Sequence, residues 1–446
     1  MTRVIIFFSL LSIVPYISKA QSCKENFLGS KTLYQSQQQK YTAVPKGYVP
    51  VFINHVGRHG SRHLTKDVNT SFIYQLLMQA DSVNGLSATG KSLKEKILRL
   101  EKIEKKDFKS ITRRGKEEQQ GLADRMYANN SNVFNQAKPV INIAYTKEIR
   151  TLQTSDAFLT ELKTKINELI VSSAINDTTL RFYDLSPAYT DFKDNGNWMH
   201  YLQQLKDSLH YKELANEIAQ PFFTPAFFKS LNKKNKDKFT TDLYGFITIF
   251  YSIQKEVIAA GYSIADVDMQ PFLSCDQLAI LGNIDNAEDY LEKGPATNAD
   301  GIQIKIAVPL LADFIKTTDA FIKTKSVNAQ LRFSHAETIS PYATLLEFST
   351  AIDTTTNTTS IINKWRADKT IPLSSNIQWI IYQKKGTEKY LVKFLLNEKE
   401  TAVKGLTTKS FPYYNWSDVR TFYLKKLKSF NASLDTDYIK YLNEVK

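Results

Sequence analysis

Cysteine is scarce in this chain, and its scarcity limits the kinds of protein that the chain can be. The 446 residues include only two cysteines, Cys23 and Cys275, too few for a small fold held together by disulfides. The sequence contains no CxxC pair, no cluster of cysteine and histidine, and no HExxH motif, so we expect no dedicated metal site. The two thiols either pair or remain isolated, and the sequence leaves both states open.

Long hydrophobic runs are also missing. The apolar stretch at residues 4–14 is too short to span a bilayer, so we expect no transmembrane segment. Arg3 before this stretch and small residues around Ala20 after it are typical of a signal peptide over residues 1–20. We therefore expect an exported protein, periplasmic or secreted. A lipid anchor on Cys23 is the weaker alternative, because the residues before it form a poor lipobox.

Acidic residues are outnumbered by basic ones. The chain has 58 Lys and Arg against 45 Asp and Glu, a net charge of +13, and removal of residues 1–20 takes away Arg3 and Lys19, which leaves 13 − 2 = +11. Nucleic acid, anionic surfaces and polyphosphorylated small molecules would all suit such a charge, although most lysines, such as those at 229–238, fit a solvated surface. An apolar content of 42% and an aromatic content of 12% are enough for a sizeable core, so disorder is not the default expectation.

One short stretch carries most of the recognisable chemistry. Residues 49–53 are apolar and predict a buried strand, which leads into Arg58-His59-Gly60-Ser61-Arg62. Guanidiniums match phosphate oxygens, neutral histidine is a nucleophile, and glycine lets the backbone approach an anion closely. The stretch therefore indicates a site that holds a phosphate and attacks it. The alternative is a basic surface turn, and the adjoining His63 either lines the mouth of such a site or packs.

Two further predicted strands are each followed by arginine, histidine or glutamate side chains. The strand at 139–145 leads into a helix near Arg150, and the strand at 329–333 leads to His335 and Glu337. In open α/β sheets, sites form beyond the carboxyl ends of strands, so we expect these groups to gather beside the first motif. On an extended strand end, residues 335 and 337 would point to the same side.

Periodicity predicts the other elements. We expect a solvated amphipathic helix over 87–109, helices over 111–127 and 304–323, and a hairpin of strands 377–384 and 389–396.

The middle of the chain has a different character. Residues 162–294 are rich in Phe, Tyr, Asn and Lys, and the clearest helix there runs over 242–261 with Asp242 as its cap. We expect a mainly helical cap over 162–294, inserted into an α/β core made of residues 21–161 and 295–446.

Taken together, the three motifs resemble the histidine acid phosphatase branch of the histidine phosphatase superfamily. Its defining RHGxR is present at 58–62, and its RTxxS-type turn is present at 150–155. Most members have His-Asp in the third stretch, whereas this chain has His335-Ala336-Glu337, which resembles the multiple inositol polyphosphate phosphatase (MINPP) subfamily. Matches at 180–184, 290–294 and 395–399 extend the resemblance over nearly the whole mature chain.

The resemblance implies a fold and a reaction. The fold is a histidine phosphatase (phosphoglycerate mutase-like) three-layer α/β core with an inserted helical cap. The reaction is hydrolysis of inositol polyphosphates such as phytate, with no cofactor and no metal. His59 would form a phosphohistidine, and Glu337 would protonate the leaving oxygen. Five residues would bind the substrate: Arg58, Arg62, Thr65, Arg150 and His335.

Elementary electrostatics agrees with these roles. Three neighbouring guanidiniums should lower the pKa of His59 and keep it neutral, and a highly phosphorylated substrate should favour protonated Glu337. We expect an acidic to near-neutral optimum whose fall at higher pH reports Glu337. The alternatives are a broad-specificity histidine acid phosphatase and a non-catalytic polyanion-binding protein. We expect a small-molecule partner rather than nucleic acid, and the sequence leaves the oligomeric state open.

Overall fold

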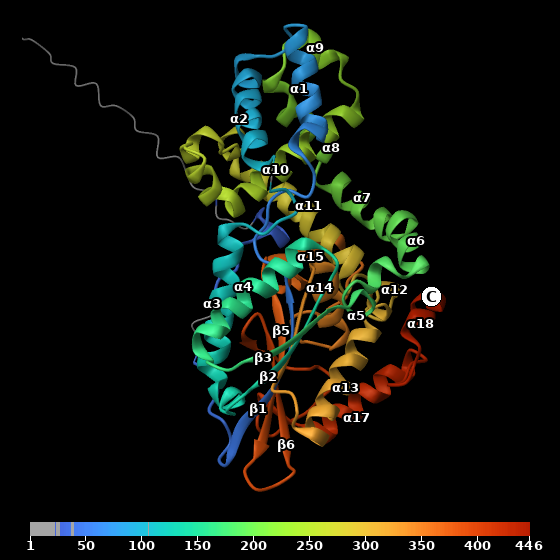
Figure 1. Cartoon of the computed structure of the whole chain (residues 1–446). Coiled ribbons are helices and arrows are strands. Elements are labelled where there is room, and N and C mark those ends of the chain that lie inside the picture. The colour runs from blue at the N-terminus through green and yellow to red at the C-terminus, as the bar shows by residue number, and fades with distance from the viewer. Residues whose placement is uncertain (1–22, 24–26, 37–39, 106) are drawn as a thin grey trace, which may run out of the picture.

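A mixed β-sheet forms the centre of the molecule (Figure 1). The computed structural model describes Cys23 and residues 27–36, 40–105 and 107–446; the expected signal peptide at 1–20 lies outside them. The strand order is β3-β2-β4-β1-β5-β6-β7, and β8 pairs with β6. The strands are β1 (Tyr48–Arg58), β2 (Val140–Tyr145), β3 (Ile170–Ile175), β4 (Ala329–Ser334), β5 (Asn376–Lys384), β6 (Tyr390–Leu396), β7 (Lys399–Glu400) and β8 (Tyr413–Asn415).

The three strands that precede the predicted site residues are parallel neighbours. β4 lies between β1 and β2, with Arg58 opposite Ser334 and Tyr145 opposite Phe333. Their carboxyl ends therefore meet at one edge of the sheet, as predicted. β1 is longer than expected, because it continues through Gly57 to Arg58. The predicted hairpin is confirmed as the antiparallel pair β5 and β6.

Helices cover both faces of the sheet, which gives the three layers expected. On one face, α3 (Arg113–Asn130) and α4 (Ile149–Lys165) pack against apolar strand residues such as Ile143 and Leu331. On the other face, α13 (Val308–Thr324), α14 (Ala336–Leu345) and α17 (Trp416–Ser429) enclose a larger core. α13 has Pro309 in its first turn, where the missing N–H costs no hydrogen bond.

A helical cap stands beyond the carboxyl edge of the sheet (Figure 1). Its apolar cluster joins α1 (Phe72–Ser82), α2 (Ala88–Glu104) and α10 (Lys233–Ala259), together with α8 (Tyr211–Ala219) and the adjoining α9 (Pro225–Ser230). The helix expected to be solvated, α2, buries Leu93 and Ile97 in this cluster. Periodicity reveals that a helix has an apolar face, but not which partner covers it.

Three sequence predictions in this region need correction. The strand β3 lies within residues 162–294, yet it pairs with β2 at the edge of the sheet. α1 and α2 lie within residues 21–161, yet they pack in the cap. The long helix α10 begins at Lys233 rather than at Asp242, because the Asn232 side chain caps it by accepting from the Asn235 N–H at 2.9 Å. Asp242 lies inside this helix and accepts a hydrogen bond from the Ile73 N–H at 3.0 Å.

α11 (Cys275–Lys293) connects the two apolar clusters, because its first half packs in the cap and its second half in the sheet core. Cys23 forms a disulfide with Cys275 at the start of this helix, and a thioether-linked lipid on Cys23 is incompatible with that bond. Within the described residues, no helix is long and apolar enough to cross a membrane.

Short helices complete the structure. They are α5 (Asp177–Leu180), α6 (Pro187–Asn195), α7 (Trp198–Ser208), α12 (Ile302–Lys305), α15 (Ile361–Lys364), α16 (Ala367–Thr370) and α18 (Tyr438–Glu444).

Candidate functional site

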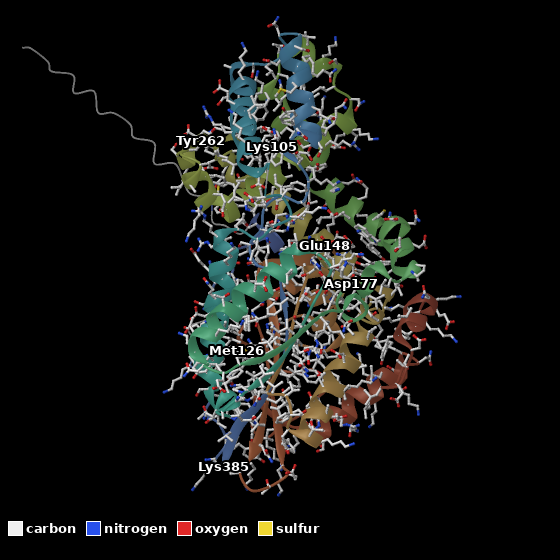
Figure 2. The ribbon with its side chains drawn as sticks, viewed as in Figure 1. Lys105, Met126, Glu148, Asp177, Tyr262 and Lys385 are labelled. Carbon is white, nitrogen blue, oxygen red and sulfur yellow. A yellow bond between two sulfur atoms is a disulfide. The ribbon has the colours of Figure 1, made fainter. Side chains whose placement is uncertain are left out.

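The predicted site residues gather where β1, β4 and β2 end beneath the cap. The imidazole rings of His59 and His335 are 5.5 Å apart between centroids, and Arg150 contacts His335. Glu148, beside Arg150 in sequence, marks this end of the sheet in Figure 2, and Lys385 marks the opposite end. The structure therefore brings together the side chains that follow these three strands, as predicted.

His59 is buried, with 4% of its surface exposed. A hydrogen bond to the backbone determines which ring nitrogen carries the proton. Its Nδ1 lies 2.9 Å from the Gly60 carbonyl oxygen. Because a carbonyl only accepts, Nδ1 carries the proton and Nε2 keeps a lone pair. Burial lowers the pKa of His59 well below its usual range, and the charges of Arg58 and Arg150 lower it further. The predicted direction is confirmed, with burial as the larger cause.

The loop that carries His59 is held from behind by α3. A Cβ on Gly60 would lie 2.6 Å from the Gly115 carbonyl oxygen, and a Cβ on Gly115 would lie 2.1 Å from that of Ser61. Glycine is therefore needed at 60 for close contact with the helix, in addition to any role beside an anion. The buried Glu118 carboxylate accepts hydrogen bonds from the Ser61 N–H and hydroxyl at 2.9 and 2.6 Å, and from Ser374 Oγ at 2.7 Å.

Two arginines have a buried N–H that the described protein leaves without a partner. Nη1 of Arg58 donates to the carbonyl oxygens of Ser30 and Ile371, both at 2.5 Å. Its Nε has no partner among the described residues, and neither has the Nε of Arg150. A buried donor without an acceptor is costly, and charged donors are the strong partners of phosphate oxygens. These two N–H groups therefore suit a bound anion.

His335 holds Arg150 in place. Arg150 Nη2 donates to His335 Nδ1 at 3.2 Å, so His335 Nε2 carries the proton and donates to Thr146 Oγ1 at 3.0 Å. Burial, followed by the charge of Arg150, lowers the pKa of His335 well below its usual range. On its other side, Arg150 Nη1 pairs with Glu148 at 2.8 Å.

The remaining two predicted substrate contacts differ in position. Arg62 is partly buried, and its Nη1 donates to the His63 carbonyl oxygen at 2.9 Å. Burial and the charges of Arg58 and Arg150 lower its pKa to about 10. Thr65 is exposed in the loop that follows, and the structure does not bring it to the other site residues through any hydrogen bond that it describes.

The prediction that Glu337 lies on an extended strand end is wrong, because Glu337 is in the first turn of α14. The chain turns into a helix immediately after His335, so Glu337 faces the site from a helix start. Its Oε1 is 3.7 Å from Lys293 Nζ, which is 2.9 Å from Asp289 Oδ1. Burial would raise the pKa of the Glu337 carboxyl, but Lys293, His335 and Arg58 hold it well below its usual range.

The sequence reasoning assigned no role to several charged neighbours of the site. Lys293 lies in the family match at 290–294, and Arg181 and Tyr183 lie in the match at 180–184. Arg181 Nη1 is 2.7 Å from Glu148 and its guanidinium lies 5.8 Å from the Tyr183 ring centre. The only signal for these neighbours in the sequence was the family resemblance of the two stretches. The spacing between the stretches does not indicate that they meet at one site.

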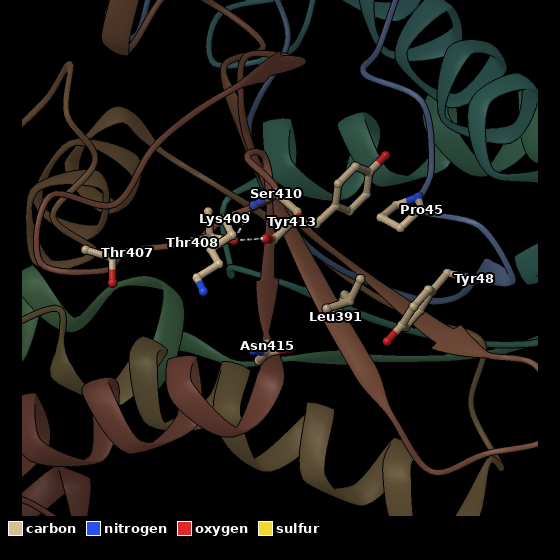
Figure 3. Close-up of a pocket in the computed structure, with 9 residues that line it drawn as sticks. All are labelled: Pro45, Tyr48, Leu391, Thr407, Thr408, Lys409, Ser410, Tyr413 and Asn415. Atoms are coloured by element: carbon tan, nitrogen blue, oxygen red, sulfur yellow. Dashed lines mark hydrogen bonds between the residues drawn. The ribbon is translucent and has the colours of Figure 1, made fainter.

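Within the described part of the chain, neither a cluster of metal-ligating side chains nor the cavity in Figure 3 offers an alternative to this site. Among the described residues, no group of three or more His, Cys, Asp or Glu could hold a metal ion. A cavity of about 620 Å³ lies beside β6 and β8 (Figure 3). Its lining includes Tyr48, Lys409 and Tyr413 but none of the predicted site residues, and it offers no nucleophilic histidine.

His63 pairs with a cap carboxylate, Glu104, which contributes to the attachment of the cap. Its Nδ1 lies 3.0 Å from Glu104 Oε1, and Glu104 Oε2 accepts from the Leu64 N–H at 2.7 Å. Burial alone would lower the pKa of His63, but the hydrogen bond and charge of Glu104 raise it. The pair therefore stabilises the fold fully below the unfolded-state pKa of about 6.5, and this stabilisation is lost as pH rises through the folded-state pKa.

Glu104→Gln is accordingly expected to destabilise the protein by about 1–3 kcal/mol at pH 5.5, and by less at pH 8.5. Urea unfolding of both proteins across this pH range measures the difference. Glu101→Gln, on the same helix and 4.0 Å from Lys105, is the matched control and should show no such pH dependence. An equal loss at all pH values would show that His63 is not the titrating partner.

Comparisons with known proteins place the chain among phosphatases. A family model described as "Histidine phosphatase superfamily (branch 2)" matches residues 51–397. The solved structure of a multiple inositol polyphosphate phosphatase from Bifidobacterium longum, in complex with inositol hexasulfate, is similar with a TM-score of 0.77 and 21% identity, covering 93% of this chain and 98% of that one. A phytase from D. castellii has a TM-score of 0.62 and 12% identity, covering 94% and 88%. Among curated protein sequences, none matches. At these identities the structural likeness concerns the fold.

Proposed function

The chain belongs to branch 2 of the histidine phosphatase superfamily, and we propose that it removes phosphate groups from inositol polyphosphates such as phytate. The observation that carries the proposal is the meeting of a nucleophile with donors for an anion. The unprotonated Nε2 of His59 lies in the same site as the Arg58 and Arg150 Nε–H groups that have no partner in the described protein. The B. longum structure, which holds inositol hexasulfate, supports this class of substrate.

The proposed reaction has two steps. The lone pair on His59 Nε2 attacks phosphorus, the bond to the ester oxygen breaks, and protonated Glu337 gives its proton to the departing alcohol. Arg58, Arg62 and Arg150 stabilise the charge on the transferring phosphoryl group. Water then attacks the phosphohistidine, Glu337 takes the water proton, and the N–P bond breaks to release phosphate.

The substrate-binding roles of His335 and Thr65 stay predictions. His335 supports the site through Arg150, whose guanidinium it orients from Nδ1. If a bound phosphate accepted the hydrogen bond that Arg150 now donates to His335, His335 Nδ1 would lie next to that phosphate. For the exposed Thr65, the loop that carries it would have to move toward the substrate.

We also propose that the protein acts outside the cytoplasm. The Cys23–Cys275 disulfide supports this location, because disulfides persist in oxidising compartments such as the periplasm and the extracellular medium. The predicted signal peptide over residues 1–20 agrees with it.

Phosphate release from phytate and from p-nitrophenyl phosphate between pH 3 and pH 8 tests the proposed function. We expect release from phytate with an optimum at acidic to near-neutral pH, and a higher kcat/KM for phytate than for the simple ester. Release from the simple ester alone would instead indicate a broad-specificity acid phosphatase. Binding of phytate without release from either compound would indicate a polyanion-binding protein.

A further inference from the structure

A lysine at the end of α11 lies between two carboxylates, one of which is the proposed proton donor. Lys293 Nζ is 2.9 Å from Asp289 Oδ1 and 3.7 Å from Glu337 Oε1. The Lys293 side chain is 12% exposed and that of Glu337 is 39% exposed, so the carboxylate remains accessible to a substrate. The shorter distance to Asp289 shows which partner holds the lysine more closely.

Lys293 belongs to a row of charged residues along α11. Asp285, Asp289 and Lys293 follow one another at intervals of four residues and share one face of the helix. Lys31 pairs with Asp285 at 3.3 Å, and Asp289 Oδ2 is buried without a partner in the described protein. Because Asp289 Oδ1 is paired with Lys293 Nζ, the lysine keeps one carboxylate partner even if its ammonium group gives up the contact with Glu337.

On the basis of the function proposed above, we propose that Lys293 is a substrate-binding residue that selects polyphosphorylated substrates. When such a substrate binds, the Lys293 ammonium group leaves Glu337 and pairs with a phosphate next to the one being removed. Glu337 is then able to take up the proton that it later delivers to the leaving oxygen.

The exchange depends on a second phosphate in the substrate. A simple monoester has one phosphate, which the arginines around His59 hold, so Lys293 stays with Glu337. An inositol polyphosphate has a neighbouring phosphate with up to two negative charges, a stronger partner for an ammonium than one carboxylate. When the lysine moves to this phosphate, Glu337 takes a proton from solvent, and that proton ends on the departing alcohol as the ester bond breaks.

The electrostatic environment of Glu337 agrees with this role. Burial acts to raise the pKa of Glu337, and Lys293 is the strongest of the groups that lower it. Burial would lower the pKa of Lys293, but Asp289 and Glu337 raise it well above its usual range, so the lysine stays charged. The other groups that interact electrostatically with Glu337 are Arg58 on β1, Arg62 after it, Tyr183, Tyr189 on α6, Glu292 on α11 and His335 after β4.

The test compares Lys293→Met and Lys293→Arg with the unmodified enzyme on two substrates. Phytate and glycerol 2-phosphate both release an alcohol that needs a proton, but only phytate has neighbouring phosphates. For each enzyme, kcat and KM are measured from pH 4 to pH 8. Lys426→Met is the matched control, because Lys426 is 14% exposed and paired with Glu347 at 2.7 Å in another part of the core. Thermal melting verifies that each variant is folded.

In the unmodified enzyme, we expect the rate with glycerol 2-phosphate to fall at lower pH than the rate with phytate. Lys293→Met should move the fall for glycerol 2-phosphate to higher pH and raise its kcat at pH 6 by about threefold to tenfold, because each pKa unit changes the protonated fraction by up to tenfold. The same variant should raise the KM for phytate by about tenfold to a hundredfold, the scale of one lost charged contact. Lys293→Arg should retain the unmodified profile, and Lys426→Met should change neither.

Two results would overturn the inference. One is an unmodified enzyme whose rates with both substrates fall at the same pH. The other is a folded Lys293→Met variant that loses activity equally on both substrates with unmoved profiles, which would make the lysine merely structural. Failure of the proposed function is distinguishable, because the unmodified enzyme would then release no phosphate from phytate at all.

Discussion

His59→Ala is expected to lower the rate of phosphate release from phytate by on the order of 10⁴- to 10⁶-fold, the scale seen when a catalytic nucleophile is removed. The His59 imidazole has an available lone pair on Nε2, and a hydrogen bond from its Nδ1 to the Gly60 carbonyl oxygen orients the ring. Without it, no phosphohistidine forms, and water alone must attack the phosphate.

Binding should survive the same substitution, which separates a lost nucleophile from a lost fold. Arg58 and Arg150 are anchored by carbonyl oxygens, by Glu148 and by His335, and none of these contacts involves His59. Calorimetry should therefore show phytate binding to His59→Ala within about tenfold of the unmodified protein. His63→Ala, in the same stretch, is the control and should keep most of its kcat. If His59→Ala retained a substantial fraction of kcat, the nucleophile would lie elsewhere.

Trapping the intermediate makes the prediction more specific. Phosphohistidine is stable in alkali and labile in acid, so an alkaline quench during turnover should show phosphate covalently attached to the unmodified enzyme and not to His59→Ala. Label on the variant protein would assign the covalent step to another residue.

The sequence predicted the centre of the site because each motif follows a strand. β1, β4 and β2 have apolar, β-branched residues and are parallel neighbours, so their following residues necessarily meet at one edge. The motif positions and the sheet rule together are sufficient to predict that His59, Arg150 and His335 lie near one another.

The sequence could not reveal contacts that depend on how helices assemble. Lys293 is at the end of α11 and Glu337 at the start of α14, and nothing in either local pattern indicates that they meet. In the same way, the apolar face of α2 predicted a helix but not its place in the cap. β3 was missed because, as an edge strand, it has mostly exposed residues and lacks a buried apolar run.

Glu337→Gln is expected to lower kcat for phytate by about 10²- to 10⁴-fold, the usual contribution of a general acid or base. Glutamine keeps the shape of the side chain but cannot give up a proton to the inositol oxygen. The departing nitrophenolate of p-nitrophenyl phosphate is stable without that proton, so the first step with this substrate should be nearly unaffected.

The two steps then separate in time. If Glu337 also takes the proton from the attacking water, p-nitrophenyl phosphate should give a burst of nitrophenolate equal to the enzyme concentration, followed by slow turnover as phosphohistidine accumulates. The fall in rate at high pH, which we assign to Glu337, should disappear in the variant. Lys293 and Asp289 hold each other at 2.9 Å without help from Glu337, so the surrounding site should persist. If kcat fell equally for phytate and for p-nitrophenyl phosphate, without a burst, another group would carry the proton. A residue that protonates the leaving group is needed for an alcohol but not for a nitrophenol, so its removal must affect the two substrates differently.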